Sequence, residues 1–129
     1  MAVHRYQGLA CWQLAVELKR RVYAFTGRMP AARDFSYCNQ IRGSARSGTS
    51  NIAEGFGRYR PAEFARFLLI ARASLVKTHN HLLDGLDQQY LNEAECQEIC
   101  VFADRALRAT TKLHAYLQRC KYQLPHGPT

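Results

Sequence analysis

Apolar residues recur every three or four positions along almost the whole chain, and alternation of period two is nowhere sustained. Spacing of three and four is typical of amphipathic helices, whereas alternation is typical of half-buried strands. The pattern predicts four helices over about 9–26, 35–56, 61–88 and 93–121, followed by a flexible tail over 122–129. We therefore expect an all-α protein with a single domain over 1–129.

Residues that favour helix ends stand at the predicted boundaries. Gly27 and Pro30 follow the first segment and favour its termination, and Pro61 suits the first position of the third segment. Asn92 and Glu95 have the spacing of a capping box at the start of the fourth segment. The connections are short, so we expect consecutive helices to be antiparallel, in an up-down-up-down four-helix bundle.

The middle of the second segment, GSARSGTSNIAEG, is unusually rich in small residues. A glycine inside a helix costs about 1 kcal/mol relative to alanine. Gly43 and Gly48 therefore need compensation, and we expect the backbone of another helix to approach closely there.

Composition narrows the class of protein. Hydrophobic residues make up 47% and charged residues 22%, as in soluble globular proteins. No apolar run approaches the roughly 20 residues needed to cross a bilayer, and the first ten residues lack the apolar region of a signal peptide, so we expect a cytoplasmic protein. The 5 cysteines, an odd number without a CxxC pair, are interpreted as core-filling thiols.

The chain is strongly basic, with a formal net charge of +8, and arginine accounts for 14 of its 18 basic residues. Arginine matches phosphate groups well, so the excess favours a polyanionic partner, although arginines could instead pair with acids on a neighbouring subunit. In an up-down bundle the end that holds the second connection is the more basic one. Candidate nucleic-acid contacts at this end are Arg58, Arg60, Arg66, Arg108, Lys112, Arg119 and Lys121.

The segment NIAEGFGRYRP joins the second and third predicted helices. It lacks the Lys-Ser/Thr of a phosphate-binding P-loop, so we interpret its glycines as serving the turn. Arg58 and Arg60 could bind a phosphate beside the start of the next helix, or could instead cap the end of the preceding one. We expect Glu54 to be partly buried and paired with Arg58. The structural residues of this motif are Asn51, Glu54, Gly55, Gly57 and Pro61.

The sequence contains no recognisable set of catalytic or cofactor-binding residues. His79 and His81 would lie on divergent faces of a helix. Cys96 and Cys100 share a face and could join a zinc site, but packing in the bundle is the simpler interpretation. We expect neither an enzyme nor a metal or cofactor site.

The chain resembles a known family through QIRGSARSGTSNIAEGFGR (40–58) and EFARFLLIARASL (63–75), with LAVELKRRVYAFTGRMP (14–30) and YLNEAE (90–95) in agreement. This is the four-helix-bundle family named for proteins encoded in intervening sequences of bacterial 23S rRNA genes. The resemblance implies a ring-like homopentamer without established enzymatic activity. The architecture is also similar to the accessory protein of diversity-generating retroelements, a basic pentamer that works with a reverse transcriptase and RNA.

These inferences favour a non-enzymatic, oligomeric protein that binds the backbone of RNA or DNA, or serves as a scaffold. The alternative is a protein–protein adaptor or assembly module with no nucleic-acid ligand. A metal-dependent enzyme that uses the histidines and cysteines is the third class.

Overall fold

The computed structural model describes residues 3–120, and this part of the chain contains helices and no strand. The long helices are α1 (Ala10–Thr26), α2 (Phe35–Phe56), α3 (Pro61–Asp87) and α4 (Glu93–Cys120). Two short 3-10 helices, η1 (Tyr6–Gly8) and η2 (Ala31–Arg33), precede α1 and α2. The predicted all-α fold with four helices is confirmed. Lys121 and the tail over 122–129 lie outside the described residues.

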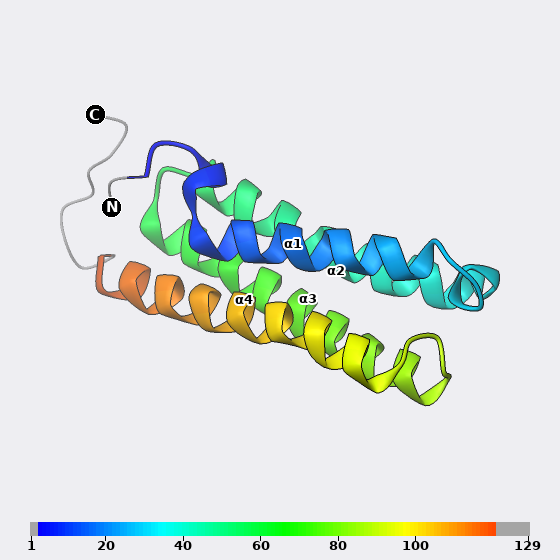
Figure 1. The fold of residues 1–129 in the computed structure, drawn as a ribbon. Coiled ribbons are helices and arrows are strands. Elements are labelled where there is room, and N and C mark those ends of the chain that lie inside the picture. Colours follow the sequence, from blue (N-terminus) through cyan, green and yellow to red (C-terminus); the bar gives the residue numbers. More distant parts are fainter. Residues whose placement is uncertain (1–2, 121–129) are drawn as a thin grey trace.

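Consecutive helices run in opposite directions, and α1 and α2 lie across from α3 and α4 (Figure 1). Each helix packs against the next one along the chain, and α1 also packs against α4. The start of α1, the α2–α3 corner and the end of α4 therefore share one end of the bundle (Figure 1).

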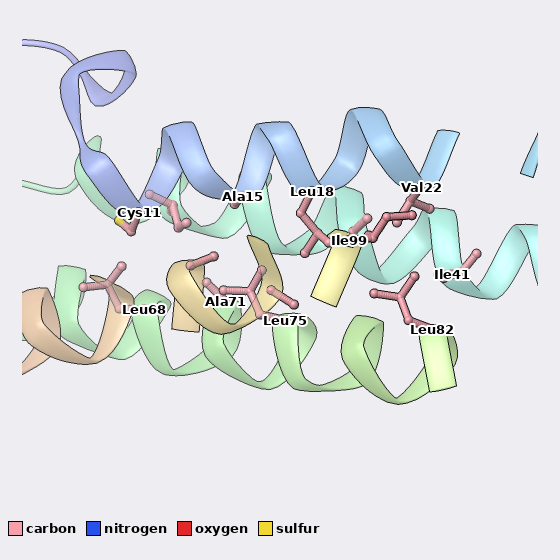
Figure 2. Packing of buried hydrophobic residues seen from close by; sticks show 14 of the residues in the cluster. Cys11, Ala15, Leu18, Val22, Ile41, Leu68, Ala71, Leu75, Leu82 and Ile99 are labelled. Atoms are coloured by element: carbon pink, nitrogen blue, oxygen red, sulfur yellow. The ribbon is translucent and has the colours of Figure 1, made fainter. Parts of the chain in front are cut away.

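The core consists of the inward faces of all four helices (Figure 2). Leu18, Ile41, Leu75 and Leu82 are completely buried. Burial of such a side chain contributes about 1.5–3 kcal/mol. The same spacing of three and four that identified the helices thus also orients them.

The capping box at the start of α4 is only half formed. The Asn92 side-chain oxygen accepts a hydrogen bond from the Glu95 N–H at 2.8 Å, as expected of an N-cap. The Glu95 carboxylate does not return to Asn92 but pairs with Arg28 beyond the end of α1. This contact joins the connection between α1 and α2 to the first turn of α4.

The glycines of α2 have different roles from those expected. A Cβ atom on Gly48 would lie 3.1 Å from Cδ2 of Leu75, so a side chain of α3, and not a helix backbone, approaches there. A Cβ on Gly55 would lie 2.7 Å from Cβ of Phe67, so α2 and α3 approach closely there. Gly55 is helical, so the expectation that it serves the turn was wrong. A Cβ on Gly43 would meet nothing within 4 Å.

Small hydroxyl groups join α2 to α3. Ser44 and Thr78 lie 2.8 Å apart, and Ser47 and Ser74 also lie 2.8 Å apart, in each case between hydroxyl oxygens. Asn51 donates its amide to the Ser47 carbonyl at 2.8 Å. Asn51 also donates to the Ser47 hydroxyl at 3.0 Å, so it contacts one of the two side chains that join α2 to α3.

Three of the five cysteines (Cys11, Cys38 and Cys96) are buried thiols, as predicted, whereas Cys100 and Cys120 are half-buried at the edge of the core. Burial raises the pKa of the Cys11 thiol to about 11. Among residues 3–120, no helix is both long and apolar enough to cross a membrane.

Candidate nucleic-acid interface

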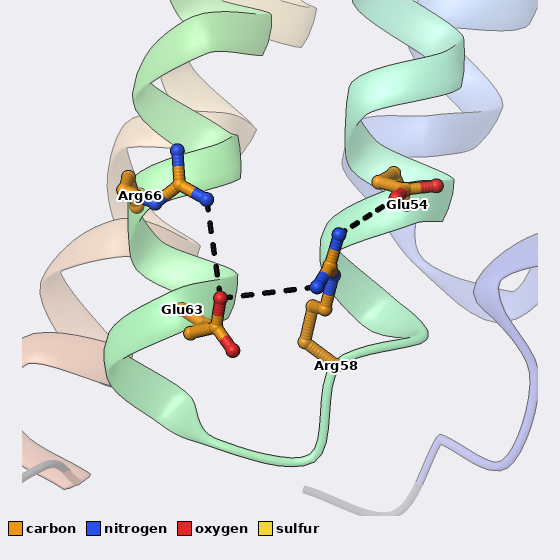
Figure 3. A network of polar contacts seen from close by, with 4 residues as sticks. All are labelled: Glu54, Arg58, Glu63 and Arg66. Atoms are coloured by element: carbon orange, nitrogen blue, oxygen red, sulfur yellow. Dashed lines mark hydrogen bonds and ion pairs between the residues drawn. The ribbon is translucent and has the colours of Figure 1, made fainter.

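An ion-pair network occupies the corner between α2 and α3 (Figure 3). Arg58 contacts Glu54 at 2.9 Å and Glu63 at 3.9 Å, and Arg66 contacts the same oxygen of Glu63 at 3.9 Å. The predicted pairing of Glu54 with Arg58 is confirmed. Glu54 is not partly buried as expected, because 56% of its side chain is exposed. Two acids and two arginines leave this network without net charge.

Aromatic contact holds the same two arginines in place. The guanidinium carbons of Arg58 and Arg66 lie 4.9 and 4.7 Å from the centre of the Phe67 ring. A cation over an aromatic ring is attracted to its electron-rich face. Both predicted phosphate contacts therefore already have partners within the corner, and the geometry favours a structural role for Arg58.

We expect Arg58→Ala to lower the free energy of unfolding by less than about 1 kcal/mol, because its ion pairs are solvent-exposed. Nucleic-acid affinity should change less than in a matched Arg108→Ala variant. Urea unfolding and a filter-binding titration would measure the two effects. A larger fall in affinity for Arg58→Ala than for Arg108→Ala would contradict the structural assignment.

Arg60 stands apart from the network. It precedes Pro61, which occupies the first turn of α3 as predicted, and its side chain does not cap the helix. Arg60 is exposed and forms no ion pair with any of the described residues. It therefore remains a candidate contact for an anion.

The exposed face of α4 carries a row of cations, which we call the α4 stripe: Arg105, Arg108, Lys112 and Arg119. Their spacing of three, four and seven places them on one side of a helix of 3.6 residues per turn. All four are exposed, and none forms an ion pair within the described part of the chain. With a rise of 1.5 Å per residue, the stripe spans roughly 21 Å.

Three members of the α4 stripe were predicted contacts, and Arg105 was missed. Arg105 lies farther from the basic end of the bundle than the predicted contacts do. Its spacing from Arg108 and Lys112 nevertheless places all three on the same face of α4. Helical spacing among the cations alone would have identified it. The predicted contact Lys121 lies outside the described residues.

A hollow of about 280 Å³ lies where the end of α4 meets the α2–α3 corner. The aromatic rings of Tyr59, Phe64 and Tyr116 line it, together with Arg60. Tyr59 is 74% exposed, and the Arg119 guanidinium carbon lies 5.8 Å from the centre of the Tyr116 ring. The α4 stripe therefore runs directly to an aromatic surface on which a planar base could stack.

Within residues 3–120, no group of three or more His, Cys, Asp or Glu side chains is placed to hold a metal ion. His79 lies 3.8 Å from Asp104, whereas His81 packs against the edge of the Tyr37 ring, so the two histidines diverge as predicted. The Sγ atoms of Cys96 and Cys100 lie 3.9 Å apart. Burial raises the pKa of Cys100 to about 12, so its thiol is a poor nucleophile at neutral pH.

Comparisons with known proteins agree with the fold. A family model described as "23S rRNA-intervening sequence protein" matches residues 7–112. A crystal structure of a protein with unknown function, from the S23 ribosomal protein family of Bacteroides thetaiotaomicron, is 20% identical with a TM-score of 0.62. The match covers 87% of this chain and 98% of that chain, and at this identity it shows the fold alone. No protein with a curated description matches the chain.

Proposed function

The chain belongs to the 23S rRNA-intervening sequence protein family, and from that premise we propose that it is a non-enzymatic bundle protein that binds the backbone of RNA or DNA. The α4 stripe carries the proposal. Four exposed cations lie on one face, and none of them forms an ion pair with a described acid. Such a row matches the repeating negative charge of a polynucleotide.

The α4 stripe binds phosphate groups, and the hollow binds a base. Arg105, Arg108 and Lys112 contact phosphates, with each arginine offering its planar fork of donors. Arg60 and Arg119 flank the hollow, where a base stacks on Tyr59 or Tyr116. Both kinds of contact tolerate any sequence, because every nucleotide has a phosphate and a flat base.

The proposal includes self-assembly into the ring-like homopentamer that the family resemblance implies. A ring would present five α4 stripes to one polymer, and multivalent contact raises avidity without new contacts at each site. The alternative role, an adaptor or assembly module without a nucleic-acid ligand, is favoured by a different observation. An exposed apolar row runs along α3, and it requires a protein partner more than a polyanion.

The salt dependence of binding tests the proposal. We expect a labelled single-stranded RNA to bind at about 50 mM salt and to dissociate as salt rises, because phosphate contacts release counterions. For the four contacts of one engaged α4 stripe the slope of log K against log salt should be near −3, from about −0.7 per contact on a single strand, and each further stripe that the strand reaches should steepen it by the same amount. Fluorescence anisotropy over a salt series measures this slope. No binding at low salt, or an affinity independent of salt, would overturn the nucleic-acid role.

A further inference from the structure

An apolar row runs along the outward face of α3. Ala62, Leu69, Val76 and Leu83 follow one another at intervals of seven residues, and all are exposed. The exposed fractions are 51% for Leu69, 47% for Val76 and 45% for Leu83. Three large aliphatic side chains in register on a surface helix form a seam of the kind that receives a second helix. Within one copy, nothing among the described residues covers this row.

A second row with the same interval runs along α2, but its residues are small: Ser36, Gly43 and Ser50. Gly43 is the informative member. Gly48 and Gly55 are explained by the close approach of α3, whereas a Cβ on Gly43 would meet nothing within 4 Å. A glycine in mid-helix destabilises the helix relative to alanine, and the packing of a single copy offers no compensation. A helix from outside the copy would supply it.

Charges at one end of these rows favour one relative direction. On α3 the row ends beside Asp84 and Asp87, and on α2 the row begins after Arg33 and ends before Glu54. An antiparallel pairing of the rows brings the two aspartates to Arg33, whereas a parallel pairing brings them to Glu54. At the other end Arg66 and Glu54 already belong to the neutral corner network of one copy, so they add no preference. Electrostatic complementarity at the aspartate end therefore favours the antiparallel arrangement.

The overall topology supplies the same arrangement. Within one copy α2 and α3 are antiparallel (Figure 1). A second copy placed alongside, with its bundle axis in the same direction, therefore presents its α2 antiparallel to the first copy's α3. No inversion of either copy is needed.

We propose that the α3 row of one copy packs against the α2 row of a second copy, with Val76 against the gap left by Gly43. The contact joins the α3 face of one copy to the α2 face of the next, so each copy has one neighbour on each face. Such contacts close into a ring when the rotation that relates neighbouring copies is a whole fraction of a full turn. This inference rests on the self-assembly part of the proposed function and is independent of nucleic-acid binding. The inference assigns the α2 row and the α3 row to the contact between neighbouring copies.

Disulfide trapping tests the pairing directly. We expect Gly43→Cys and Val76→Cys chains of different tag lengths, when co-expressed and oxidised, to form a crosslinked heterodimer on a non-reducing gel. Neither variant alone should crosslink beyond the wild-type chain, which carries the same native cysteines. Crosslinking of Val76→Cys with itself would indicate a two-fold contact and overturn the proposal, as would the absence of any additional crosslink.

A matched pair of charge substitutions provides an independent readout. Val76→Glu should reduce the solution mass measured by light scattering to that of smaller species, because it places a carboxylate in the contact. Val101→Glu on α4 alters a valine of similar exposure, 50%, outside both rows, and it should leave the mass unchanged. Equal masses for the two variants would contradict the assignment. RNA binding distinguishes failure of this inference from failure of the nucleic-acid role. If Val76→Glu is dispersed but still binds RNA at low salt, assembly and RNA binding are separate properties. If a variant of the α4 stripe keeps the wild-type mass but no longer binds RNA, the stripe acts in RNA binding and not in assembly.

Discussion

A triple variant with glutamine at Arg105, Arg108 and Lys112 should bind single-stranded RNA roughly a hundredfold more weakly than the wild-type chain at about 50 mM salt. The substitutions remove three adjacent members of the α4 stripe, and a cation that no longer meets a phosphate no longer releases a counterion. The slope of log K against log salt should therefore fall in magnitude by about 2 for each α4 stripe that engages the strand. Anisotropy titrations at several salt concentrations measure both quantities.

The control removes an equal charge elsewhere. Lys19→Gln, Arg20→Gln and Lys77→Gln together give the same change in net charge but leave the stripe intact. If affinity depends only on overall charge, both triple variants bind equally weakly, and the α4 stripe is not the binding site. The stripe residues are exposed and without ion pairs in the described structure, and the control set loses only the exposed contact of Arg20 with Glu17 at 3.8 Å, so the fold should tolerate both sets, which circular dichroism can verify.

Gly55→Ala should lower the free energy of unfolding by about 2 kcal/mol, although alanine is the better helix former. The new Cβ would lie 2.7 Å from Cβ of Phe67 and 3.3 Å from the carbonyl oxygen of Phe64. Neither atom can move away by rotation of a side chain, so α2 and α3 must separate. For a domain of this size, the corresponding fall in melting temperature is about 8 °C.

Gly57→Ala is the matched control two residues later. Its φ of −71° lies in the right-handed region, and a Cβ there would have 3.4 Å to the Glu54 carbonyl oxygen. We expect a change within about 0.5 kcal/mol. Comparable destabilisation in both variants would show that the corner needs glycine for its backbone conformation, and would contradict the packing role given to Gly55. Thermal and urea unfolding of the two variants distinguish these outcomes.

Two parts of the corner motif show where sequence reasoning about the site reached its limit. The pairing of Glu54 with Arg58 could be predicted because residues four apart on a helix are neighbours. The involvement of Glu63 and Phe67 could not, because both come from α3 and meet Arg58 only when the corner folds. In the sequence Arg66 therefore resembled a free phosphate contact and Arg58 had only Glu54 as an expected partner, whereas the structure also gives both arginines Glu63 and Phe67 as partners.

The sequence by itself determined the four helices, their order and their inward faces, because apolar periodicity and helix-end residues act within a few positions of one another. It also contained the α4 stripe, whose spacing is local to one helix. Only the tertiary structure decided which arginines form ion pairs, why Gly55 must be glycine, and that a Cβ on Gly43 would meet nothing within 4 Å in its own copy. These depend on distances between α2 and α3, and contacts between separate helices are fixed by packing and not by the spacing of residues along either one.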